Sequence, residues 1–381
     1  MSHRHVTDHR RPEIAGALNI LSGGSGARRS TSNRTLADGN ESVMADKSIA
    51  MDSSEIANVS TPPRPQDSLR SNIDLPFRRT YYPLGYAVEI LTNDPDVLKA
   101  ANESFGHSRY SRGSSILQVR IGVGEGIGLE CPPEPTRRQF NHLYSLIADV
   151  ENQALLDLKS CTSFIWLTRP AVNNRLYLRY NFLEKAVYLL LGASVVTDLH
   201  AACVSKNGKG ILFCGDSGAG KSTLSYACAR AGWVYTSDDT SYLINDSEIP
   251  CVIGHSHRVR FRPAARAIFP ELQNRQLTPR LEGKPSIEVP IADLPVQRTQ
   301  DQTTVDFIVY LNRRPSATGS LIRVPAGTAT LRARNELYSA GEIRAKHEKI
   351  LEVLSSVPTY ELEYCRLDDA IRLLDFLVQG S

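Results

Sequence analysis

The segment from Gly215 to Ser222 has the residue types and spacing of a phosphate-binding loop. It reads Gly-Asp-Ser-Gly-Ala-Gly-Lys-Ser, which fits the pattern G-x-x-x-x-G-K-[ST]. Its glycines allow the backbone to wrap closely around phosphate oxygens, because they lack a Cβ atom and adopt positive φ at little cost. We expect the Lys221 ammonium to face the β and γ phosphates and the Ser222 hydroxyl to bind Mg²⁺. The segment predicts an ATP site made of Gly215, Asp216, Ser217, Gly218, Ala219, Gly220, Lys221, Ser222 and Thr223.

The residues on either side of this loop predict a strand that enters it and a helix that leaves it. The apolar run 210–214 is typical of a buried strand. Apolar residues at helical spacing over 223–232, ended by Gly232, predict a helix whose first N–H groups point at the phosphates. The alternative is a glycine-rich turn that joins a strand to a helix by chance.

Two aspartates follow the expected strand 233–236. An apolar strand that ends in carboxylates beside a phosphate loop is where such enzymes hold Mg²⁺ or activate a nucleophile, so Asp238 and Asp239 can divide these tasks. Ser-Asp-Asp-Thr is also good turn chemistry, which leaves a solvated turn as the alternative. His200 lies in an expected strand over 194–205. Such a histidine is more often structural, but its strand is expected beside the loop strand.

The order and spacing of these motifs resemble the catalytic domain of HPr kinase/phosphorylase and its HPr-kinase-like relatives. The resemblance covers about 195–245 closely and 246–376 weakly, and residues 76–190 do not resemble the N-terminal domain of the HPr kinase. The matching segments are Leu199-His200-Ala201, the loop Gly215–Ser222, Ala231-Gly232-Trp233 and Ser237-Asp238-Asp239.

This resemblance implies a phosphoenolpyruvate-carboxykinase-like P-loop nucleotide domain that uses ATP and Mg²⁺ to phosphorylate a serine hydroxyl. It implies three catalytic residues: Asp239 takes the hydroxyl proton, His200 assists it, and Lys221 binds phosphate. It implies Ser222 as a Mg²⁺ ligand, with Asp238 in support of the metal shell. It also allows a homo-oligomer, since enzymes of the family often form rings of subunits.

The region 254–263 departs from the family pattern. It reads Gly-His-Ser-His-Arg-Val-Arg-Phe-Arg-Pro and lacks the glutamate of the family's Glu-x-Arg-Gly signature. This departure weakens the expectation of a reverse phosphorylase activity, of a second metal ligand and of HPr as the substrate. The acceptor is therefore left open: a serine of a protein or peptide, a small molecule such as free serine, or no acceptor at all in a nucleotide-sensing regulator.

The same region offers a row of alternating arginines. Arg258, Arg260 and Arg262 would share one face of a strand, where they could meet phosphate or form a solvated basic edge. Lys284 is a similar, weaker candidate.

The rest of the chain predicts two further parts. Residues 1–75 are polar without a sustained period, so we expect a disordered tail, in which translation could start at Met44 or Met51; intact mass would decide. Residues 76–181 predict a small α+β domain without a recognisable catalytic constellation, and 182–381 the catalytic α/β domain. We expect strands at 86–91, 115–123, 164–168, 176–180, 305–311 and 358–363, helices at 95–105, 182–193, 342–354 and 368–378, and over 140–150 either a strand pair or an irregular helix.

Composition sets the remaining limits. A net charge of +3 is too small to favour nucleic acid as a partner, and no apolar run reaches the length of a membrane span. The seven cysteines are scattered without a CxxC pair, as in a reducing compartment, so we expect a cytoplasmic protein.

Overall fold

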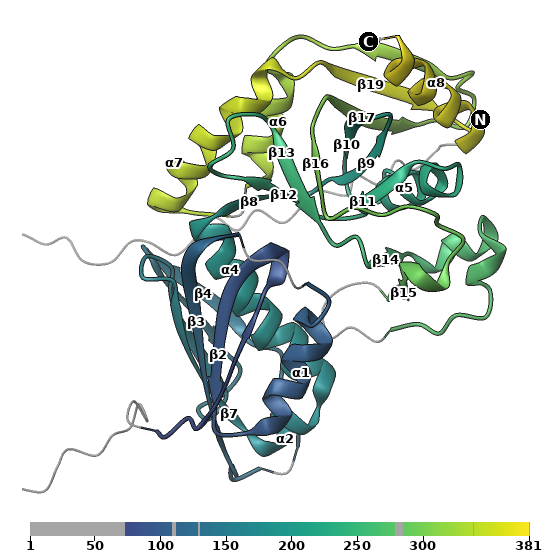
Figure 1. Ribbon diagram of the computed structural model, residues 1–381. Coiled ribbons are helices and arrows are strands. Elements are labelled where there is room, and N and C mark those ends of the chain that lie inside the picture. The colour runs from purple at the N-terminus through teal and green to yellow at the C-terminus, as the bar shows by residue number, and fades with distance from the viewer. Residues whose placement is uncertain (1–72, 109–111, 129, 279–284, 338, 381) are drawn as a thin grey trace, which may run out of the picture. The chain divides into compact units, whose positions relative to one another are not determined.

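The computed structural model describes residues 73–108, 112–128, 130–278, 285–337 and 339–380 (Figure 1). These residues belong to one compact unit, Gln66–Ser381. The expectation of a disordered tail over 1–75, the alternative starts Met44 and Met51, and the candidate Lys284 fall on residues outside the described ranges, except for 73–75. The division at 75/76 and 181/182 stays a prediction. The chain is mixed α/β, with its described strands in four sheets.

The N-terminal part of the described chain forms a seven-stranded sheet with the strand order β1-β2-β3-β7-β6-β5-β4. The parallel strands β2, β3 and β7 form its centre, and the other pairs are antiparallel. Helices α1 (Pro95–Phe105) and α4 (Glu184–Ser194) pack against this sheet (Figure 1). The strands are β1 (Phe77–Tyr81), β2 (Tyr86–Thr92), β3 (Arg112–Gly124), β4 (Thr136–Phe140), β5 (Leu143–Ile147), β6 (Gln153–Asp157) and β7 (Thr162–Thr168).

Local sequence explains most of these elements. The side chain of Asp94 caps α1 by accepting a hydrogen bond from the N–H of Asp96 at 2.9 Å, and Pro95 occupies the first helical position, as expected. Strands β4 and β5 show that the region 140–150 belongs to a strand pair.

The expected strand over 176–180 is wrong. Short helices α2 (Arg169–Asn173) and α3 (Arg175–Tyr177) and a π-helical turn over Leu178–Leu183 lead into α4. The Asn174 side chain accepts a hydrogen bond from the N–H of Tyr177 at 3.1 Å and so caps this helical run. The run Leu-Tyr-Leu-Arg-Tyr is too short for its period to separate strand from helix.

The C-terminal part contains a six-stranded sheet, β11-β9-β10-β17-β19-β18, and a four-stranded sheet, β16-β13-β12-β8. Strands β10, β17 and β19 run parallel to one another. The strands are β8 (Val196–Leu199), β9 (Ala202–Lys206), β10 (Lys209–Cys214), β11 (Val234–Ser237), β12 (Ser241–Ile244), β13 (Cys251–Gly254), β16 (Gln302–Thr304), β17 (Phe307–Arg313), β18 (Ser320–Arg323), β19 (Thr359–Tyr364) and the separate pair β14 (Arg258–Phe261) and β15 (Ile287–Pro290).

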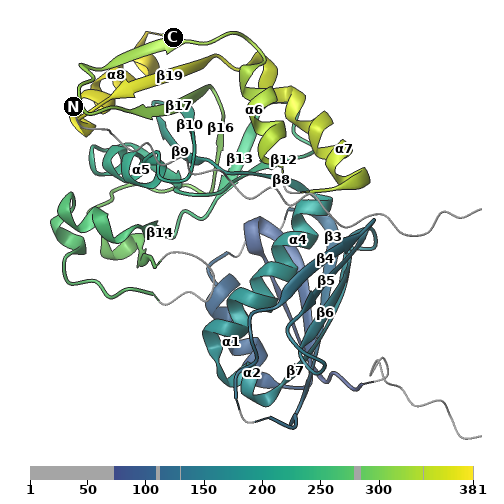
Figure 2. The ribbon, with the colours of Figure 1, turned by 180° about the vertical axis from the view of Figure 1, so that it is seen from behind.

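Helices cover the outer face of the six-stranded sheet. Leu224 of α5 (Lys221–Arg230) and Leu374 of α8 (Leu367–Gln379) share a buried cluster with Ile211 and Val309 of the sheet. The other face packs on the four-stranded sheet and on α6 (Thr328–Glu336), which α7 (Gly341–Ile350) follows. Figure 2 shows α5 and α8 on the side of the sheet opposite α6. Among the described residues, no helix has the length and apolar character needed to cross a bilayer.

The expected single strand over 194–205 is also wrong, and the difference matters for the site. The chain forms two strands there, β8 in the four-stranded sheet and β9 in the six-stranded sheet. His200 and Ala201 lie where it crosses between them. The N–H of Ala201 donates to the carbonyl of Leu199 at 2.8 Å, a three-residue turn centred on His200. A tight turn of apolar neighbours carries no strong sequence signal, so the two strands looked continuous.

Candidate functional site

The segment Gly215–Ser222 connects the buried strand β10 to α5, as its sequence predicts. Gly215, Gly218 and Gly220 have φ values of 141°, 95° and 104°, which side chains with a Cβ rarely adopt. A Cβ added at Gly220 would also lie 2.9 Å from the Tyr364 hydroxyl. The helix begins at Lys221, so its first N–H groups face the inside of the loop.

Lys221 is the cation inside this loop. Its side chain is buried, and Nζ donates to the carbonyl oxygens of Gly215 at 2.6 Å and Asp216 at 3.3 Å. Nζ also lies 2.9 Å from Nε2 of His200. Burial lowers the pKa of Lys221, and the nearby carboxylate of Asp239 opposes that shift. The loop's own carbonyl oxygens therefore hold the lysine side chain inside the loop.

The topology explains why His200 and the aspartate pair lie together. The chain crosses between the same two sheets twice, at 200–201 and at 238–240. Because β8 pairs with β12 and β9 pairs with β11, the two crossings lie side by side. Nδ1 of His200 lies 3.7 Å from Oδ1 of Asp239. The structure thus brings together Lys221, His200 and Asp239, the three residues expected to be catalytic.

Asp238 and Asp239 have different surroundings. The side chain of Asp239 is half exposed, whereas Asp238 is buried and its Oδ2 accepts a hydrogen bond from the N–H of Arg260 at 2.8 Å. Burial and the neighbouring Asp239 raise the pKa of Asp238 to about 6. A nearby cation would stabilise the charged form of the buried Asp238 carboxylate. Asp239, in contrast, is accessible to solvent.

The two residues expected to hold Mg²⁺ are in contact through the backbone of Asp238. The Ser222 hydroxyl donates to the backbone carbonyl of Asp238 at 3.2 Å. A hydroxyl and carboxylate oxygens are the hard ligands that Mg²⁺ prefers, and Mg²⁺ keeps several waters besides. These donors fit the ion. No cluster of three or more His, Cys, Asp or Glu side chains with metal-site spacing occurs among the described residues, so phosphate oxygens and water would complete the shell.

Two of the three alternating arginines pair with carboxylates of the protein. Arg258 and Arg260 lie on β14, where Arg258 pairs with Glu184 at 3.8 Å and Arg260 with Glu288 at 2.8 Å. Their charges therefore meet carboxylates of the protein. The backbone of Arg260, through its bond to Asp238, does serve the site.

Glu336 is a site residue that the sequence did not indicate. It is the last residue of α6, and burial raises its pKa while the charges of His200 and Lys221 oppose the shift. A cavity of about 20 Å³ lined by His200 and Glu336 has room for a water molecule only. Glu336 is more than a hundred residues from the loop in a charged helix, where a glutamate is usually solvated, so no pattern singled it out.

Comparisons with known proteins leave the family open. No protein-family model and no curated protein matches this chain. A solved structure, the Hpr(Ser) kinase/phosphatase from Coxiella burnetii, is similar at 13% identity over 49% of this chain and 99% of that chain, with a TM-score of 0.25. At that TM-score the similarity carries no argument about what this chain does.

Proposed function

We propose that this chain is an ATP-dependent kinase that transfers the γ-phosphoryl group to a hydroxyl. One observation carries the proposal: the phosphate loop, through Lys221 and His200, is connected to the accessible carboxylate of Asp239 by contacts of 2.9 Å and 3.7 Å. A loop that only bound nucleotide would not need a carboxylate connected to its lysine. A kinase needs both, because the attacking hydroxyl must lose a proton next to the transferred phosphate.

In this mechanism the oxygen of the acceptor hydroxyl forms a bond to the γ-phosphorus, and the bond from that phosphorus to the bridging β–γ oxygen breaks. The proton of the hydroxyl moves to Asp239. Lys221 and the N–H groups at the start of α5 stabilise charge on the transferred oxygens. His200 lies between Lys221 and Asp239, with one ring nitrogen near each of them. Mg²⁺, held by Ser222 and Asp238, would neutralise phosphate charge.

A search for the acceptor tests this proposal. The protein is incubated with γ-labelled ATP, Mg²⁺ and a lysate of the source organism, and labelled species are separated by size. We expect one labelled hydroxyl compound, protein or small molecule, that depends on Lys221 and Asp239. Tight ATP binding without transfer to any species and without hydrolysis would instead support a nucleotide-sensing regulator.

A further inference from the structure

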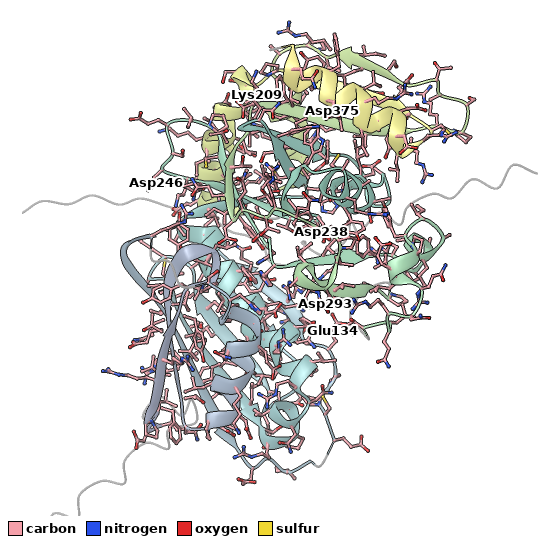
Figure 3. The ribbon with its side chains drawn as sticks, turned by 45° about the vertical axis from the view of Figure 1, so that its right-hand side comes forward. Glu134, Lys209, Asp238, Asp246, Asp293 and Asp375 are labelled. Atoms are coloured by element: carbon pink, nitrogen blue, oxygen red, sulfur yellow. The ribbon has the colours of Figure 1, made fainter. Side chains whose placement is uncertain are left out.

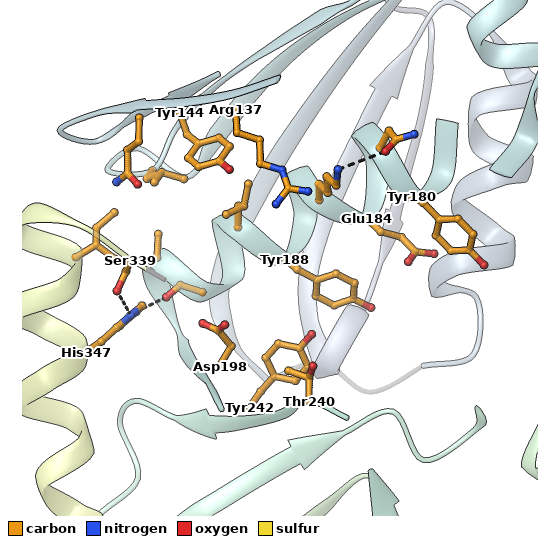
Figure 4. A pocket seen from close by; sticks show the side chains of 18 of the residues that line it. Arg137, Tyr144, Tyr180, Glu184, Tyr188, Asp198, Thr240, Tyr242, Ser339 and His347 are labelled. Carbon is orange, nitrogen blue, oxygen red and sulfur yellow. Dashed lines mark hydrogen bonds between the residues drawn. The ribbon is translucent and has the colours of Figure 1, made fainter. Parts of the chain in front are cut away.

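A cavity of about 590 Å³ lies next to the aspartate pair (Figure 4). It is bounded by α4, the four-stranded sheet, the β4–β5 hairpin and α7, so elements far apart in sequence enclose it. Its volume is in the range of small-molecule sites and is larger than a serine side chain needs. Figure 4 shows Thr240, Tyr242, Asp198 and Tyr188 close to one another at this cavity.

The cavity adjoins the proposed catalytic carboxylates. Thr240 follows Asp239 directly and lines it. Arg260, whose N–H binds Asp238, lines it as well. A molecule in this space would lie beside the residues that flank the aspartate pair, and a kinase needs its acceptor hydroxyl close to the carboxylate that takes the proton.

Strand register places an acidic and an aromatic residue on one face. Asp198 of β8 lies opposite Tyr242 of β12, so both side chains project from the same face of the four-stranded sheet. Tyr242 stacks on Tyr188 of α4, with ring centroids 5.7 Å apart and an angle of 18° between the rings. His255 packs edge-on against both rings. The result is a rigid aromatic wall beside a carboxylate.

Asp198 differs from the other acid at this cavity. Glu184 is buried and already bound by the Ser104 hydroxyl at 2.8 Å, by Arg179 at 3.4 Å and by Arg258 at 3.8 Å. Asp198 is exposed, and within the described ranges it has neither a hydrogen bond nor an ion pair. A carboxylate that faces a cavity beside stacked tyrosines is suited to an ammonium group, which gains from both the charge and the rings.

We propose that this cavity is the acceptor pocket and that the acceptor is a small hydroxyl compound carrying an ammonium group, which Asp198 binds beside Tyr188 and Tyr242. The inference rests on the proposed kinase function. The acceptor hydroxyl points to Asp239, attacks the γ-phosphorus and gives its proton to that carboxylate, while ADP leaves.

The test is a length series of probes. Linear amino alcohols with two to eight carbons are compared with diols of the same length, and glucosamine with glucose. Equilibrium binding is measured on the full chain with Mg²⁺ and a non-hydrolysable ATP analogue, and transfer with γ-labelled ATP. We expect amines to bind at least 10-fold more tightly than their matched hydroxyl compounds, with a single optimum of chain length.

Variants of Asp198 test whether the probes bind in this cavity. Asp198→Asn should remove the preference for amines and leave the ATP affinity unchanged, and Asp198→Glu should retain part of it. Asp246→Asn is the matched control: Asp238 and Asp246, labelled in Figure 3, lie at opposite ends of β12, and Asp246 is outside the cavity lining. It should bind every probe like the unmodified chain.

The outcomes separate the two proposals. Amine binding that depends on Asp198, with no transfer to any probe or lysate species, keeps the cavity site and overturns the kinase. Transfer to a protein acceptor whose KM is the same in Asp198→Asn keeps the kinase and overturns the cavity proposal. Equal binding of amines and diols, or no saturable binding of any probe, also overturns it.

Discussion

The contact between Lys221 and His200 determines which nitrogen of His200 carries the proton. Nζ of Lys221 lies 2.9 Å from Nε2 of His200, and an ammonium can only donate, so Nε2 accepts. The proton of the neutral imidazole is then on Nδ1, the nitrogen that faces Asp239. The histidine therefore connects the cation of the loop to the carboxylate that we propose as the base.

Removal of this connection should slow transfer without weakening ATP binding. We expect His200→Ala to lower kcat by roughly 10- to 100-fold, less than loss of the base itself, because Asp239 remains but is no longer oriented. KM for ATP should stay within about 2-fold. Steady-state kinetics checks this, with His142→Ala, at an exposed hairpin position, as the control. An unchanged kcat would remove His200 from the mechanism.

Lys221→Ala should abolish detectable transfer and weaken nucleotide binding at least 10-fold, since the buried ammonium is the loop's own positive charge. Titration with a fluorescent ATP analogue measures the affinity, and γ-labelled ATP the transfer. Lys159→Ala removes the same charge from an exposed turn and should change neither. Near-native affinity in Lys221→Ala would show that the loop does not hold the phosphates.

Gly220→Ala should damage the loop for two separable reasons. Its φ of 104° strains a residue with a Cβ by about 1–2 kcal/mol, and the added Cβ would lie 2.9 Å from the Tyr364 hydroxyl. We expect loss of ATP binding, with only partial recovery when Tyr364→Phe is added. Gly192→Ala, in a helix with open space around the position, should stabilise the fold by up to about 1 kcal/mol. Thermal unfolding and ATP titration compare the three variants.

The raised pKa of Asp238 predicts how the free energy of unfolding of the metal-free protein depends on pH. Its pKa is about 6 in the folded chain and about 3.9 in an unfolded one, so the folded state binds its proton more tightly. This difference in pKa adds up to about 3 kcal/mol to the free energy of unfolding below about pH 4. The contribution is lost as the pH rises through about 6. Asp238→Asn, which can still accept from the N–H of Arg260, should abolish this dependence and unfold at higher urea at pH 7. Identical urea midpoints for Asp238→Asn and the unmodified chain at pH 7 would contradict the raised pKa of Asp238.

The conformation of the loop Gly215–Ser222 could be predicted from local sequence, whereas the way in which the candidate site is assembled could not. The residue types of Gly215–Ser222 predict the loop conformation, and Asp94-Pro95 predicts the start of α1. Both features depend on residues that are neighbours in sequence. The contact of His200 with Asp239 depends on two crossings between two sheets, which no local pattern shows. Glu336 and Asp198 are ordinary surface acids in the sequence, and only the packing of α6, β8 and β12 gives them neighbours that matter.

The central claim is that Asp239 accepts the proton of the attacking hydroxyl. Its most direct test is Asp239→Asn, assayed for transfer to the acceptor labelled in lysate and, separately, for ATP affinity. The account predicts an ATP affinity within about 3-fold of the unmodified chain and a fall in kcat of at least roughly 10²-fold. Transfer at the unmodified rate in Asp239→Asn would contradict it.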